Sequence, residues 1–129
     1  MISYQDLKIR LASSAFRSRF KLDTAGKCYA LEKGPEQIFF QARQILRTRL
    51  GAAEPVNDGK QTPMRGHVVF TAQHATGSCC RGCLEKWHHI PRHRVLTEEE
   101  ISAVAEIITR WIFEQTQAGE NISYTPDLL

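Results

Sequence analysis

The sequence lacks any long apolar run, although 42% of its 129 residues are hydrophobic. A membrane-spanning helix needs about 20 apolar residues in a row, so we expect no transmembrane helix. The first residues, MISYQDLKIRLASS, also lack the apolar core of a secretory signal peptide. We therefore expect a cytoplasmic protein, in a reducing compartment where cysteines stay free or bind metal.

A strong net charge is also missing, since 17 Lys and Arg against 14 Asp and Glu leave only +3. The charge is nevertheless divided along the chain. Residues 1–94 hold 16 basic and 7 acidic residues, whereas residues 95–129 hold one basic and seven acidic residues. The basic part predicts either a surface for phosphate backbones or pairing with an acidic C-terminal helix. The small total favours intramolecular pairing, because domains that bind nucleic acid are more strongly basic.

Apolar residues recur at helical spacing over most of the chain, and the length suits one domain. We expect a mainly α fold of four to five helices in a single domain, 1–129, with a loose tail at 120–129. The expected helices cover residues 4–11, 24–33, 35–50, 79–87 and 97–112, with one or two further turns after Ser13 or Ser14.

Local signals mark several boundaries of these elements. Gly34 followed by Pro35 predicts the end of one helix and the start of the next. Thr97 and Glu100 form a capping-box pattern. The apolar run HVVFTA predicts a short strand or extended segment near 67–72. Residues 51–66 read as a long irregular loop, which is typical of a functional or disordered segment.

Cysteine and histidine are concentrated in one short segment, HATGSCCRGCLEKWHHIPRH, which holds three of four cysteines and four of five histidines. Zinc binds cysteine sulfur and histidine nitrogen in a tetrahedron of four ligands. The spacing of Cys80, Cys83 and His88 resembles part of a zinc knuckle. A helix starting at Cys79 would instead group Cys79 and Cys83 with His74 and turn Cys80 toward the core. Both arrangements stay open, and the remaining cysteine, at position 28, is expected in the core.

The longest motif of the chain lies around the same segment. It comprises Asn57 to Gly66, Gln73 to Thr76, Cys79 to Cys83, Lys86 to His88, Ile90-Pro91 and Arg94 to Thr97. Together with SAFRSRFKL upstream, it resembles a small, mostly bacterial family known only as a domain of unknown function. The resemblance implies membership and no assigned activity.

The chain departs from that family pattern in three places. Val68 stands for an expected Pro, Gly77-Ser78 for Ala-Thr, and His93 for Gly. The resemblance therefore favours a zinc site drawn from five residues and leaves His67 as an outside candidate. The five candidate metal ligands are His74, Cys79, Cys80, Cys83 and His88.

Three hypotheses for function stay open. The first is a small metal-binding module that contacts nucleic acid through basic residues around the site, with Trp87 either stacking on a base or packing in the core. The candidate contacts are Lys60, Arg65, Arg81, Lys86, Arg92 and Arg94. The second is a metal- or Cys/His-dependent enzyme of unknown substrate, with Asp58 or His67 as acid or base. The third is a metal-stapled domain whose basic face binds an acidic protein or a second copy.

Overall fold

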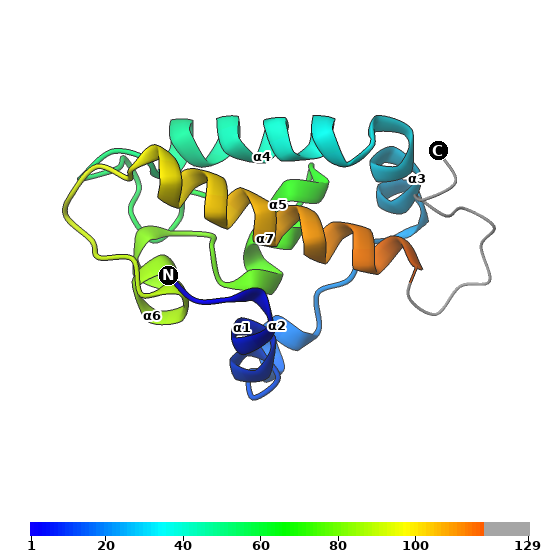
Figure 1. Ribbon diagram of the computed structural model, residues 1–129, viewed down its shortest axis with the longest axis horizontal. Coiled ribbons are helices and arrows are strands. Elements are labelled where there is room, and N and C mark those ends of the chain that lie inside the picture. Colours follow the sequence, from blue (N-terminus) through cyan, green and yellow to red (C-terminus); the bar gives the residue numbers. More distant parts are fainter. Residues whose placement is uncertain (118–129) are drawn as a thin grey trace.

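The computed structural model describes residues 1–117, which form seven helices and no strand (Figure 1). The mainly α prediction is confirmed. The helix number is higher than expected, partly because the turns after Ser14 count as a helix of their own. The helices are α1 (Tyr4–Leu11), α2 (Ala15–Ser18), α3 (Thr24–Lys33), α4 (Pro35–Leu50), α5 (Val68–Thr76), α6 (Arg81–His88) and α7 (Glu98–Gln117).

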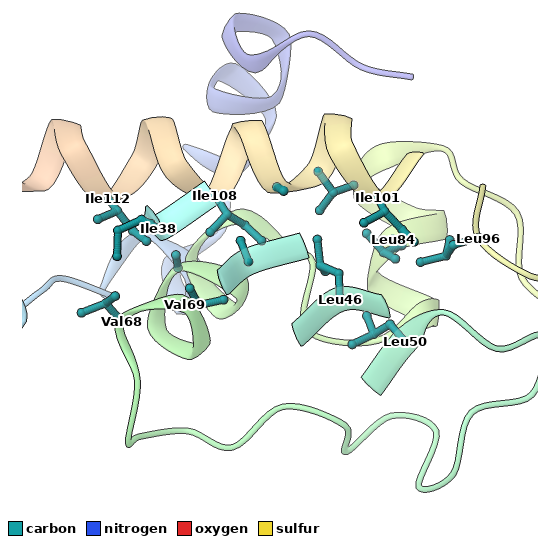
Figure 2. Close-up of a cluster of buried hydrophobic side chains, with 14 of the residues drawn as sticks. Ile38, Leu46, Leu50, Val68, Val69, Leu84, Leu96, Ile101, Ile108 and Ile112 are labelled. Atoms are coloured by element: carbon teal, nitrogen blue, oxygen red, sulfur yellow. The ribbon is translucent and has the colours of Figure 1, made fainter. Parts of the chain in front are cut away.

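The long helices α4 and α7 lie side by side, with α1 and α2 on the other side of α7 (Figure 1). Each long helix places a stripe of apolar residues toward the other, as amphipathic helices do. Figure 2 shows side chains such as Ile38 and Leu46 of α4, Val69 of α5 and Ile108 of α7 in one shared cluster. This cluster is the main core of the protein.

A smaller apolar cluster joins α1 to α6. Leu7 and Leu11 of α1 pack with Trp87 of α6 and Ile107 of α7. Trp111 contacts both clusters, so the two are continuous. Trp87 is only 8% exposed, so of its two predicted roles the structure supports packing in the core.

The predicted caps are present. Gly34 adopts φ of +83° between α3 and α4, and Pro35 is the first residue of α4. Thr97 and Glu100 form the reciprocal capping box, with backbone N–H to side-chain oxygen distances of 3.0 Å in both directions. These signals act within four residues of each other, which is why the sequence alone identifies them.

The predicted strand or extended segment at 67–72 is wrong, because these residues enter helix α5. Nδ1 of His67 caps the helix by accepting from the N–H of Val69 at 3.0 Å, and Gly77 ends it in the left-handed conformation. Seven of the nine α5 residues are buried. A short apolar run buried on nearly every side shows no helical period, so its pattern does not distinguish helix from strand.

The acidic last helix pairs with the basic part of the chain at three positions. Glu98 forms ion pairs with Arg43 and Arg47 of α4, and Glu114 pairs with Lys8 of α1. Glu100 pairs with Arg94. The intramolecular pairing predicted from the charge distribution is confirmed for these residues.

Three further expectations meet different outcomes. Cys28, expected in the core, is exposed on α3. This helix is only weakly amphipathic, and Ala30 is its one buried residue. The predicted loose tail at 120–129 lies outside the described residues. Among the helices described, none is both long and apolar enough to cross a membrane.

Candidate metal centre

The three clustered cysteines meet where the chain leaves α5 and enters α6. Cys79 lies in the connecting loop, Cys80 is the N-cap of α6, and Cys83 lies in its first turn. The Sγ atom of Cys83 is 3.0 Å from that of Cys80 and 3.5 Å from that of Cys79. All three sulfur atoms lie within 4.8 Å of one another, so this group could hold a metal ion.

A tight turn at Gly77 brings the cysteines to this position. Gly77 has φ of +71°, a backbone conformation that residues with a side chain rarely adopt. A Cβ added there would lie 2.7 Å from Cγ of Trp87. The loop that follows is held from the other side, because Oγ1 of Thr62 donates to the carbonyl oxygen of Cys79 at 2.7 Å. The long irregular segment 51–66 therefore supports the cysteine loop.

Arg17 of α2 supplies a positive charge to the thiols. Its Nη2 lies 3.2 Å from Sγ of Cys83, and its Nη1 lies 3.8 Å from Sγ of Cys79. Nη1 also donates to the carbonyl oxygen of His74 at 2.6 Å, and the guanidinium lies 5.6 Å from the ring centre of Trp87. The cation is therefore fixed by the fold against two of the three sulfurs.

The three thiols differ in acidity because they hydrogen-bond to one another. Hydrogen bonds from Cys79 and Cys83, with help from the backbone N–H groups at the start of α6, hold the pKa of Cys80 far below its usual value. The hydrogen bond between Cys79 and Cys80, together with burial, raises the pKa of Cys79. Of the three thiols, Cys80 is thus the one whose pKa is lowered, and it lies at a helix N-terminus, which favours negative charge.

The structure does not bring the two candidate histidines into the group of metal donors described within residues 1–117. Nε2 of His74 lies 3.3 Å and 3.2 Å from the carbonyl oxygens of Thr62 and Pro63. Nε2 of His88, which is 1% exposed, donates to the carbonyl oxygen of Thr76 at 2.8 Å. Burial lowers the pKa of His88 to about 4. Both rings are thus held by backbone carbonyls.

Neither spacing alternative describes the cluster completely. The helix begins at Arg81, so Cys79 precedes it and Cys80 takes an extended conformation with φ of −159°. The Sγ of Cys80 folds back to accept from the N–H of Cys83 at 3.3 Å, and both Cys79 and Cys80 join the group. Cysteine is not among the usual N-cap residues, so this cap cannot be predicted from the residue type. The contact of Arg17 with the thiols cannot be predicted either, because only its place in the motif SAFRSRFKL marks that residue in the sequence.

The six basic residues around the site divide into two sets. Arg81 is 1% exposed, and its terminal nitrogens donate to the carbonyl oxygens of Leu50, Ala52, Pro91 and Arg94. Arg92 pairs with Asp58, and Arg94 pairs with Glu100. Lys60, Arg65 and Lys86 are exposed. Half of the candidate phosphate contacts therefore hold the fold itself together.

Comparison with known proteins identifies the family. The model of the family described as Domain of unknown function (DUF4186) matches residues 5–113, so the chain belongs to this family. The matched span contains Arg17 and the whole cysteine group. No solved structure matches the chain.

Proposed function

We propose that this member of the DUF4186 family binds zinc through Cys79, Cys80 and Cys83. The observation that carries the proposal is the convergence of their three sulfur atoms within 4.8 Å. Zinc–sulfur bonds of about 2.3 Å in a tetrahedron place neighbouring sulfurs about 3.8 Å apart. The observed separations of 3.0 and 3.5 Å would therefore need to widen by less than about 1 Å.

The proposed centre has three protein ligands among the described residues. Zinc normally takes four, and sites with three protein ligands keep the fourth position for water or substrate. Within residues 1–117, no carboxylate or histidine nitrogen joins the three sulfurs. The fourth position is therefore open to water or to a donor outside the described residues.

Arg17 would balance the charge of such a centre. Three thiolates and one Zn²⁺ carry a net charge of −1, and the guanidinium lies against the sulfurs of Cys79 and Cys83. Groups that hydrogen-bond to metal ligands orient them and tune their affinity for the metal. Arg17 is thus proposed to act on the metal through the sulfurs.

Elemental analysis of the purified protein tests the proposal. We expect one zinc per chain in the wild type and its loss in Cys79→Ser, Cys80→Ser and Cys83→Ser. Cys28→Ser is the matched control, because Cys28 is exposed on α3, away from the group. Replacement of zinc by cobalt should give sulfur-to-metal charge-transfer absorption that weakens with each Ser variant. A metal-free wild type whose four thiols all titrate freely would contradict the proposal, and stoichiometric iron would contradict its choice of metal.

Nucleic-acid contact stays a prediction, and the exposed residues that could provide it are Lys60, Arg65 and Lys86. Phosphate contacts are strongest at low salt. Absence of retention on DNA or RNA at about 50 mM salt would therefore count against it. An enzymatic role of the centre and a role in binding an acidic protein also stay predictions.

A further inference from the structure

A cleft separate from the cysteine group opens between two stretches of chain distant in sequence. One wall is the segment 19–26, where the chain passes from α2 into α3, and the other is the loop 64–67 with the start of α5. The cleft encloses about 910 Å³, which lies within the range of small-molecule sites. None of the three clustered cysteines lines it.

The cleft combines apolar walls with basic side chains. Phe20 and Tyr29 supply aromatic surfaces, and Met64, 53% exposed, adds a flexible apolar side chain. Phe20 is already held in place, because its ring stacks on His74 with centroids 5.4 Å apart. Such a surface suits a flat or aromatic group of a ligand.

The charges around the cleft are unbalanced. Its lining includes three basic residues, Arg19, Lys21 and Arg65, and one acidic residue, Asp23. Oδ1 of Asp23 accepts from the N–H of Gly26 at 2.7 Å, as the cap of α3. Within residues 1–117, the three cations form no ion pair with a carboxylate. By contrast, Arg92 and Arg94 each have a carboxylate partner.

His67 adds a directed polar group. Its Nδ1 accepts from the N–H of Val69, so the proton of the neutral ring sits on Nε2. The ring is half-buried against Tyr29, and burial lowers the pKa of His67, which keeps the ring neutral near pH 7. A neutral Nε2–H donor with positive side chains nearby suits an anionic oxygen.

We propose that this cleft binds an organic anion of nucleotide size, with a phosphate on Arg19, Lys21 and Arg65 and an aromatic group on Phe20, Tyr29 and Met64. Arginine binds phosphate through two parallel hydrogen bonds, and lysine acts as a point charge. The nucleotide could be free or part of a single strand, since both carry the same chemistry. The proposal does not depend on zinc.

Binding of mononucleotides to the full chain tests the proposal. The probes are AMP and CMP, with adenosine and inorganic phosphate as the separate halves. We expect a nucleotide to bind in titration calorimetry and to shift the methyl NMR signal of Met64, while Met1, the other methionine, stays unchanged. Each half should bind more weakly than the whole. Absence of both signals for AMP and CMP at millimolar concentration would overturn the proposal.

Paired variants locate the binding. Lys21→Ser combined with Arg65→Ser should weaken nucleotide binding at least tenfold. Lys8→Ser combined with Arg110→Ser removes the same charge beside Tyr4, outside the lining of the cleft, and should leave the binding unchanged. Equal loss in both pairs would overturn the cleft as the site. A single-stranded octanucleotide that binds more tightly than AMP, still dependent on Lys21 and Arg65, identifies a strand as the source. Weaker binding of the octanucleotide identifies a free nucleotide. Zinc content, measured on the same samples, should not change.

Discussion

The guanidinium of Arg17 lies 3.2 Å from the sulfur of Cys83, which is 66 positions further along the chain. The contact exists because the single turn of α2 packs against α5, directly before the cysteine loop. Cation–π contacts with Phe16 and Trp87 hold the arginine in place. The positive charge beside the thiols therefore depends on the packing of α2 against α5.

Replacement of Arg17 by Met should weaken zinc binding about 10- to 100-fold, the usual effect of losing a hydrogen bond to a metal ligand. Met retains the packing against Trp87 but removes the charge and both donors. Competition with a chromophoric chelator measures the change. Lys86→Met, an exposed cation on α6, should leave the affinity unchanged. A similar loss in both variants would show that only the general positive charge matters.

Replacement of Gly77 by Ala should destabilise the protein by about 2 kcal/mol or more. The new Cβ would combine a left-handed φ with atoms of Trp87 less than 3 Å away. Gly59→Ala is the matched control, because Gly59 has φ of +92° but no atom within 4 Å of an added Cβ. Urea unfolding should therefore show the larger loss at Gly77, and equal losses would contradict the role of Trp87.

Replacement of Arg81 by Met should lower the free energy of unfolding by about 3 kcal/mol or more, because four carbonyl oxygens lose their charged donor in a buried place. Arg81→Lys should recover only part of the loss, since an ammonium has three donors and no planar fork. Arg92→Met, which breaks a more exposed ion pair, should cost about 1 kcal/mol or less. Full rescue by Lys would contradict this account.

His88 should make stability depend on pH. Its pKa falls from 6.5 in the unfolded chain to about 4 in the fold. Between these values the unfolded state binds a proton that the folded state does not. Stability is thus fully present above pH 6.5 and falls by up to about 3 kcal/mol as the pH drops to 4.

Urea unfolding of wild type and His88→Gln at several pH values measures this contribution, with zinc content matched. The variant should be less stable near pH 7, because it lacks the imidazole that donates to the carbonyl oxygen of Thr76. Its stability should decline less steeply below pH 6.5, because glutamine does not titrate. Parallel declines would show that other groups cause the dependence.

Much of the fold could be predicted from neighbours within four residues. The Gly34–Pro35 boundary and the capping box of Thr97 and Glu100 are of this kind. Helix α5 could not be predicted from such local signals. Because it is buried on nearly all sides, its apolar residues do not recur at helical spacing. The exposure of Cys28 was missed because a weakly amphipathic helix does not reveal which of its faces will be covered.

For the site, the sequence by itself determined that three thiols lie within five residues, beside the start of a helix. Only the tertiary structure decided which other side chains serve them. His74 and His88 are near the cysteines in sequence, yet their Nε2 atoms lie at hydrogen-bond distance from backbone carbonyl oxygens in the interior. Arg17 is remote in sequence, yet the docking of α2 brings it to the sulfurs. The reason is physical: a buried polar group must find a partner, and packing of distant segments decides which partners are within reach.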